Sequence, residues 1–355
     1  MLLIINFLTN LIISLLLLLL VNYYKNSNLE KSIHFIQLSF SIKYIIYMLS
    51  AFFMAFYLSK FYFNYIFLII PTLYMLFLLY IDSLIFFKTI KNIRNSEITI
   101  LNYLKNIFKD SLLIFIPVMI NIIIKNFFKP NNAILYLFIT IFTILLYNLY
   151  YPYIVRFTLD SCKKDNKLSL FFTNNLSLDI NFNIYVYNGK TCKNANAMIC
   201  GIFNNYHIYI SDYLIENMSS SELKSIIIHE IAHIKKHHLL IKNIILTSSV
   251  PLMITIGSLM DTWEDYFGKI NRILGITLFL LILFIYSIIF LLYISRKQEY
   301  EADEFTVNKI NKEIYINALT KLANLNLYTQ KRTFIRELLS THPSIENRIN
   351  NLKNL

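Results

Sequence analysis

The sequence predicts a mainly α-helical, polytopic membrane protein, with about seven transmembrane helices and a polar insertion that contains a small β-sheet. The composition is the first observation behind this prediction: 56% of the residues are hydrophobic and only 15% are charged, far less charge than a soluble domain of this length carries. The second is a series of apolar runs long enough to cross about 30 Å of hydrocarbon. The third is a polar stretch between Arg156 and His238, whose short alternating segments are typical of strands.

The apolar runs divide the chain into membrane and polar parts. Candidate spans lie near residues 3–23, 43–60, 64–87, 111–128, 133–155, 240–260 and 272–294. We therefore expect a membrane region of about five spans over 1–155, an insertion over 156–238, a hairpin of about two spans over 239–294 and a polar C-terminal segment over 295–355.

Charge around the spans predicts their orientation. The first run has no Lys or Arg before it and no small-residue cleavage site, so we expect an uncleaved span with its N-terminus outside. Loops 24–42 and 88–110 then lie inside, and they carry more positive charge than the outside loops. The insertion and the C-terminal segment are accordingly predicted to be cytoplasmic. Lysines flanking the spans account for the formal charge of +12, so no nucleic-acid partner is expected.

A metal-binding pattern lies at the end of the insertion. The sequence HEIAH contains His229, Glu230 and His233. Residues four apart share one face of a helix, which suits two imidazoles that bind a single Zn²⁺ ion. Glu230 follows the first histidine directly and is placed to act as a general base. The preceding SSSE at 219–222 predicts that a capped helix begins there.

Two further histidines follow the pattern, but helix geometry argues against them as ligands. His237 lies roughly 12 Å along the helix axis from His229 at 1.5 Å per residue, whereas zinc–nitrogen bonds are about 2.0–2.1 Å. IKKHH contains no glycine that would break the helix. We expect His237 and His238 to be cations at the helix C-terminus or groups that support the ligands.

The third ligand must therefore come from elsewhere in the chain. Acidic residues concentrate in SRKQEYEADEF, directly after the last span, and a two-span hairpin returns this segment to the same side of the membrane. Glu299 and Asp303 are four apart and share a helix face, one as ligand and one as its supporting partner. Glu301 and Glu304 are rival ligands.

These motifs together resemble a known superfamily. HEIAH, then EYEAD after a hairpin, then STHPSIENRI is similar to the membrane-embedded zinc metalloproteases that include HtpX and the type I CAAX prenyl endopeptidases, with the latter closest in layout. The resemblance implies a zincin-like cytoplasmic catalytic domain with Glu299 as third zinc ligand and Asp303 as its support. It further implies that His342 helps to bind the reacting carbonyl and that Arg348 lies near Asp303.

A candidate substrate strand precedes HEIAH. NANAMICG is a short segment beside a glycine, and HIYIS after it alternates as a strand does. An edge strand here would bind a substrate peptide in extended form, with Asn196 and Ala197 against the substrate backbone. The segment resembles the strand region of the prenyl endopeptidases. It departs from them at Met198, where an aromatic residue is typical, and Ala232 replaces the glycine of HExGH.

Three functions are consistent with these residues. The first is a zinc-dependent endopeptidase, with one Zn²⁺ per chain, that hydrolyses membrane-associated or CAAX-type substrates. The second is quality-control proteolysis of misfolded membrane proteins, as the resemblance to HtpX implies. The third is a membrane sensor that binds metal without proteolysis. Structural zinc sites are usually closed by four protein ligands, whereas these residues offer His, His and Glu with an open position, and this argues against a sensor. A peptide or membrane-protein substrate and the lipid bilayer are the expected partners.

Overall fold

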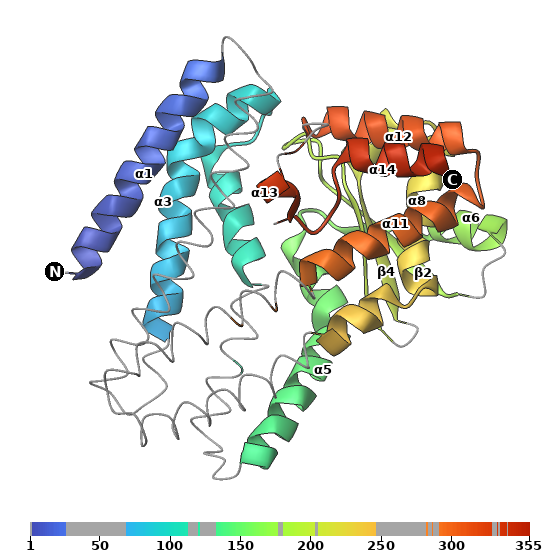
Figure 1. Ribbon diagram of the computed structural model, residues 1–355, viewed down its shortest axis with the longest axis horizontal. Helices are drawn as coiled ribbons and strands as arrows, with labels where there is room; N and C mark the ends of the chain where they lie inside the picture. The colour runs from blue at the N-terminus through green and yellow to red at the C-terminus, as the bar shows by residue number, and fades with distance from the viewer. Residues whose placement is uncertain are drawn as a thin grey trace.

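The computed structural model describes residues 2–25, 69–112, 120, 133–176, 180–202, 205–245, 282, 286, 291–328, 332, 334–338 and 340–355. Long apolar helices lie on one side, and a layered α/β domain that contains the C-terminus lies on the other (Figure 1). The chain is mainly helical with one small mixed sheet, as the sequence predicts.

Three long helices come from the predicted membrane region. They are α1 (Leu2–Lys25), α3 (Ile69–Arg94) and α5 (Ala133–Thr158). α1 packs against α3 through the fully buried Val21 and Phe86. Within this pair, the Ser14 hydroxyl donates a hydrogen bond of 2.5 Å to the buried Asp82 carboxylate.

One helical segment among the described residues, Leu73–Arg94, is long and apolar enough to cross a membrane by length and composition, and a shorter apolar segment covers Asn10–Tyr23. The predicted span 43–60 lies outside the described residues, as do most of 111–128, 240–260 and 272–294. The full set of about seven spans stays a prediction.

A four-stranded sheet forms the centre of the α/β domain. Its strands are β1 (Lys163–Lys164), β2 (Phe182–Tyr187), β3 (Ala197–Cys200) and β4 (Tyr206–Ser211), in the order β1-β2-β4-β3. β2 and β4 pair in parallel, whereas β1 and β3 pair antiparallel and occupy the edges. The strand predicted from the alternation of HIYIS is confirmed as β4.

Alternation along the central strands supplies a core on each face of the sheet. Ile184, Ile208 and Ile210 pack with residues of α8 (Ser220–Lys235) and α12 (Lys312–Leu325). On the other face, Tyr185 and Tyr209 pack against the end of α5. The remaining helices are α6 (Asn166–Leu176), α7 (Asp212–Asn217), α11 (Ile294–Val307), α13 (Phe334–Leu338) and α14 (Ile345–Asn354).

α8 contains HEIAH, and the elements packed around it bring the other candidate site residues to this helix. It lies between the sheet and the C-terminal helices, where it contacts β3, α11 and α12 (Figure 1). α14 packs in turn on α11 and α12. Segments more than sixty residues apart in the sequence are thereby brought to one face of α8.

Candidate active site

The helix that contains HEIAH begins where the sequence predicts. The Ser219 hydroxyl accepts a hydrogen bond from the Glu222 N–H, and the Glu222 carboxylate accepts one from the Ser219 N–H, so the predicted capping box is confirmed. His229 and His233 lie one helical turn apart and are both buried. Because the cap fixes the helix start and the apolar face fixes its rotation, the two imidazoles share one orientation toward α11.

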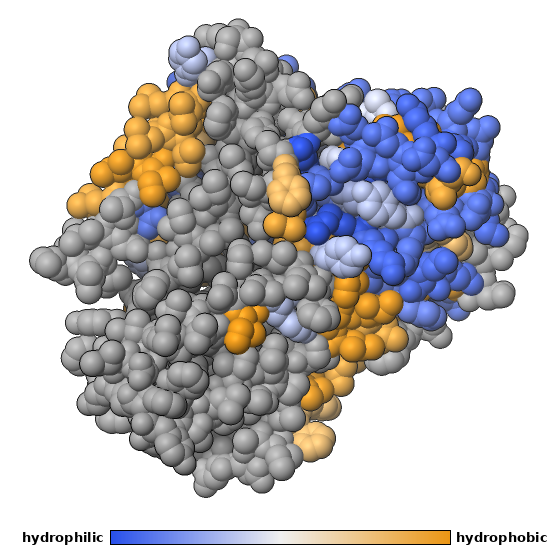
Figure 2. Space-filling view, in the orientation of Figure 1, coloured by the Kyte–Doolittle hydropathy of each residue, from blue (hydrophilic) through white to orange (hydrophobic). Residues whose placement is uncertain are grey.

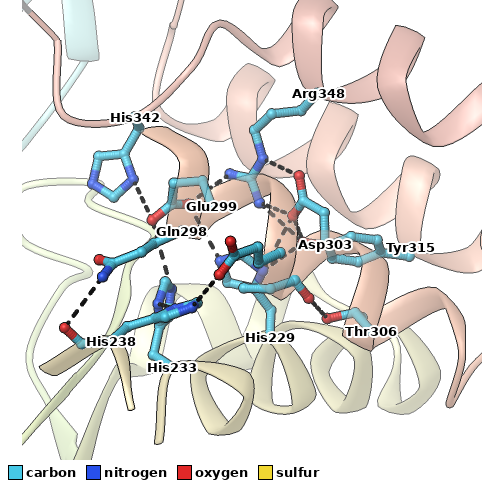
Figure 3. Close-up of polar contacts among 12 residues, drawn as sticks. His229, His233, His238, Gln298, Glu299, Asp303, Thr306, Tyr315, His342 and Arg348 are labelled. Carbon is cyan, nitrogen blue, oxygen red and sulfur yellow. Dashed lines mark hydrogen bonds and ion pairs between the residues drawn. The ribbon is translucent and has the colours of Figure 1, made fainter. Parts of the chain in front are cut away.

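The acidic residue that meets both imidazoles is Glu299 of α11, which is 2% exposed. Its carboxylate oxygens lie 3.4 Å from Nε2 of His229 and 3.6 Å from Nε2 of His233 (Figure 3). One donor atom from each of the three residues lies within 4.8 Å of the other two. Of the rival ligands, Glu301 contacts His238 and Glu304 is exposed.

Buried polar side chains hold the other ring nitrogen of His229. Its Nδ1 lies 2.9 Å from the Tyr315 hydroxyl and 3.2 Å from Oδ1 of Asp303, and the same hydroxyl donates to Asp303 at 2.6 Å. Arg348 Nε donates to Asp303 Oδ2 at 2.9 Å. Burial raises the pKa of the Asp303 carboxyl, but Arg348 and His229 outweigh that effect and hold it at about 2. Asp303 is therefore a charged anchor for His229.

Tyr315 was not singled out by the sequence. It is fully buried on α12, and its ring stacks on that of His229. The chain contains 26 tyrosines, and nothing in the local sequence of Tyr315 distinguishes it from the others. Only the packing of α12 against α8 reveals its contact.

His238 supports the second imidazole, and it does so because the helix breaks. α8 ends at Lys235, His237 adopts a left-handed conformation with φ of 56°, and helical residues resume at His238. The expectation of an unbroken helix through IKKHH is therefore wrong. The break turns His238 back, so that its Nδ1 lies 2.9 Å from Nδ1 of His233 and its Nε2 lies 3.0 Å from Glu301.

Two residues of the C-terminal segment reach Glu299. Nη1 of the buried Arg348 lies 3.5 Å from one carboxylate oxygen. Nδ1 of His342 lies 3.0 Å from the other, although the His342 side chain is 62% exposed (Figure 3). The resemblance placed Arg348 near Asp303, and the structure has the two in contact. Both C-terminal side chains therefore border the three-donor cluster.

Glu230 lies on the more open side of the same helix turn. Its side chain is partly exposed. Desolvation raises the pKa of its carboxyl to about 7, with His229 acting in the opposite direction. Burial, and after it the charge of Glu230, raise the pKa of the Cys200 thiol to about 12. The helix that contains Glu230, α8, packs on β3.

The predicted substrate strand is an edge strand. β3 pairs with β4 from Ala197 to Cys200, and the backbone of Asn196 continues the contact through hydrogen bonds with Ser211. Among the described residues, no other strand pairs with β3. Ala197 thus lies on the edge strand, at the opposite end from Cys200, and Asn196 directly precedes it with its backbone N–H and C=O bonded to Ser211.

The chemistry of the donor set fits a metal ion. Two neutral imidazoles and a carboxylate, without cysteine, form the ligand set of open zinc sites, in which a further position is left for water or substrate. Each imidazole is also held at its other nitrogen, as metal-binding histidines usually are. A sheet with a free edge, beside a helix that contains the two imidazoles and an adjacent glutamate, is typical of the HExxH class of metallopeptidases.

The family follows from direct comparison. The sequence profile of peptidase family M48 matches residues 174–355, about half of the chain, and the chain belongs to this family. The superfamily resemblance drawn from HEIAH, EYEAD and the HP pattern is thereby confirmed.

Individual relatives agree with this assignment. The chain is 33% identical over 169 residues to a Protease HtpX homolog of Aquifex aeolicus, and 31% identical over 171 residues to one of Helicobacter pylori. These matches cover 39% and 42% of this chain and 55% and 54% of the relatives, so the chain spans about half the length of the curated relatives it matches. The fold is similar to that in the crystal structure of S. mikatae Ste24p, with a TM-score of 0.58 at 19% sequence identity; the match covers 90% of this chain and 83% of that one.

Proposed function

We propose that this chain is a membrane-embedded, zinc-dependent endopeptidase that hydrolyses peptide bonds of membrane-associated or CAAX-type substrates. The observation that carries the proposal is the convergence of His229, His233 and Glu299 beside Glu230. These three side chains would hold one Zn²⁺ per chain. The bound ion supplies Lewis acidity toward the scissile carbonyl and acidifies water.

The protein side chains transfer the proton, hold the ligands and stabilise the developing charge. Glu230 takes the proton of the attacking water and returns it to the leaving amine. Asp303 and Tyr315 fix the ring of His229, and Arg348 keeps Asp303 charged. His342, exposed at the edge of the site, donates to the developing oxyanion.

The free edge of β3 supports binding of the substrate in extended form. A peptide added there would pair its backbone with Ala197, because the N–H and C=O of Asn196 are already hydrogen-bonded to Ser211, and would run toward Cys200 at the other end of the strand. Since α8 packs on β3, the peptide would lie near the helix that contains Glu230 and two of the three donors.

Placement in a membrane is supported by the surfaces of the long helices. Large apolar side chains of α1, α3 and α5 are exposed, among them Leu16, Phe77 and Phe138. α1 forms an apolar face on one side of the molecule, whereas the α/β domain is largely hydrophilic (Figure 2). We place the N-terminus outside, and we place the insertion 156–238 and the segment 295–355 in the cytoplasm. The hairpin 239–294 would join these two parts across the membrane.

The substrate class has two candidates. Fold similarity to Ste24p over 90% of the chain favours a CAAX-type substrate. Sequence similarity to the HtpX homologs favours quality-control cleavage of misfolded membrane proteins. A metal-binding sensor without proteolysis is the remaining alternative, and a ligand set with an open position speaks against it.

One experiment tests the proposal. The purified protein and its Glu230→Gln variant are incubated with a prenylated CAAX peptide and with an unmodified unfolded protein, each with and without chelator. We expect cleavage by the metal-loaded wild type alone, while Glu230→Gln retains its metal. Cleavage of the prenylated peptide only supports the CAAX reading, and cleavage of the unfolded protein supports the alternative. Undiminished cleavage by Glu230→Gln would refute the mechanism.

A further inference from the structure

The side chain of Asn326 bonds to the backbone that directly precedes the candidate substrate strand. Asn326 caps the C-terminus of α12 and is 3% exposed. Its Oδ1 accepts a hydrogen bond of 3.1 Å from the Ala195 N–H, and its Nδ2 donates one of 2.6 Å to the Ala195 C=O. One side-chain amide thus satisfies both backbone groups of a residue 131 positions earlier in the chain.

The surrounding carbonyl groups fix the orientation of this amide. Nδ2 of Asn326 also donates to the C=O of Leu322 at 3.2 Å, so two carbonyl oxygens receive its protons. An amide turned the other way would direct Oδ1 at these carbonyls and leave the Ala195 N–H without an acceptor. Asn326 therefore offers Ala195 a donor and an acceptor at once, as a residue of a neighbouring strand does.

Alternation along the backbone shows which edge of the strand the amide occupies. The Asn196 N–H donates to Ser211 Oγ, and the Asn196 C=O accepts from the Ser211 N–H at the end of β4. Successive residues of a strand direct these groups to opposite edges, so Ala195 and Ala197 both point away from β4. Asn326 occupies the first of these two positions, and Ala197 is the next one along the free edge.

The helix that carries Asn326 also holds a candidate metal ligand. Tyr315 of α12 contacts Nδ1 of His229 at 2.9 Å, and α12 packs on α8. One helix therefore contacts the beginning of the edge strand with one buried side chain and the ligand with another. The two contacts fix where a peptide on β3 lies relative to His229.

We propose that Asn326 is a positioning residue that closes the free edge at Ala195 and holds β3 for an extended substrate, so that backbone pairing with the substrate begins at Ala197. This inference rests on the proposed function, because it takes β3 as the substrate strand. It adds a residue of the C-terminal segment that acts on the substrate through the backbone of Ala195.

Hydrogen exchange at single residues tests the closed position. In the Glu230→Gln background, the Ala195 N–H should exchange slowly and the Ala197 N–H fast. The prenylated CAAX peptide or the unfolded protein, at saturation, should slow Ala197 and leave Ala195 unchanged. Asn326→Ala should speed exchange at Ala195 about 10-fold. Asn324→Ala, the same change at an exposed residue of α12, should not.

Two results of this exchange experiment would overturn the proposal. One is equal exchange of the Ala195 N–H in the Asn326→Ala and Asn324→Ala variants. The other is an Ala197 N–H that neither of the two substrates protects.

Kinetics separate positioning from folding. Asn326→Ala should raise KM about 10-fold through the lost hydrogen bonds and leave kcat within a factor of about two, because the ligands and Glu230 stay in place. Asn324→Ala should leave KM unchanged. Metal content by elemental analysis should be equal in the two variants. Loss of metal from Asn326→Ala alone would assign the residue to the folding of the site and overturn the positioning role.

A carboxyl group in place of the amide allows a rescue by acid. The carboxylate of Asn326→Asp can accept from the Ala195 N–H but cannot donate to its C=O, so KM should rise as in Asn326→Ala. Burial raises the pKa of the introduced carboxyl, and its protonated form regains the missing donor. As the pH falls, KM relative to wild type at the same pH should recover for Asn326→Asp and not for Asn326→Ala. Parallel pH profiles of the two variants would contradict the proposal.

The inference and the proposed function fail in different ways. Cleavage by Asn326→Ala with a wild-type KM would overturn the inference and leave the proposed function in place. Protection of the Ala197 N–H by a substrate that the wild type does not cleave would contradict the proposed function and leave the closed edge in place.

Discussion

The Nδ1 atoms of His233 and His238 lie 2.9 Å apart, and Nε2 of His238 lies 3.0 Å from the Glu301 carboxylate. If Nε2 of His233 binds the metal, its Nδ1 carries the proton and donates it to His238. The proton of His238 then lies on Nε2 and faces Glu301. The pair thus fixes the tautomer and the orientation of one candidate ligand.

Loss of His238 should therefore weaken metal binding. We expect His238→Ala to lower Zn²⁺ affinity about 10- to 100-fold in a chelator competition. His238→Asn should recover part of this loss, because the amide oxygen can accept the proton in place of Nδ1. His237→Asn, at a neighbouring position whose φ of 56° asparagine tolerates, is the control and should retain wild-type affinity. Wild-type affinity of His238→Ala would exclude the supporting role.

Glutamates on α11 allow a matched test of the third ligand. Glu299→Gln removes the charge that faces both imidazoles, so the purified protein should lose most of its metal in elemental analysis. Glu304→Gln makes the same change five residues away at an exposed position and should leave one ion per chain. Equal metal content in the two variants would contradict Glu299 as a ligand.

The buried pair of Asp303 and Arg348 should show strong coupling. Arg348→Leu leaves the Asp303 carboxylate buried without its cation, and removal of one partner from such a pair costs about 3–5 kcal/mol of unfolding free energy. Asp303→Asn combined with Arg348→Leu should recover a substantial part of that loss. Urea unfolding of the single and double variants measures the coupling, and simple additivity would argue against it.

Acid should remove the stabilising effect of the helix cap. The backbone N–H of Ser219 is the main group that lowers the pKa of Glu222 from 4.5, and Lys321 adds to the effect. Because the folded pKa lies below the unfolded value, the contribution of Glu222 is present above about pH 4.5 and declines as the pH falls through the folded pKa. We expect Glu222→Gln to lower Tm at pH 7 and the difference from wild type to shrink on acidification. A difference that stays constant between pH 7 and pH 3 would contradict this origin.

Local rules predicted several features of the site. A spacing of four residues placed His229 and His233 on one helix face, and SSSE predicted the capping box. Alternation in HIYIS predicted β4. Each of these features depends on residues within about one helical turn or a few strand positions, so the sequence alone contains the information.

The tertiary structure decided what lies beyond that range. Residue patterns left Glu299, Glu301 and Glu304 as rival ligands, and only the packing of α11 on α8 distinguishes them. Glu299 meets the imidazoles, Glu301 contacts His238, and Glu304 is exposed. Tyr315 supports His229 because α12 packs on α8, a contact that leaves no local signal. The helix break at His237 occurs without a glycine, since the buried contacts of His238 with His233 and Glu301 can offset the local cost of a left-handed residue. Sequence thus determined the first two candidate ligands, and long-range packing selected the third and built the groups that hold all three.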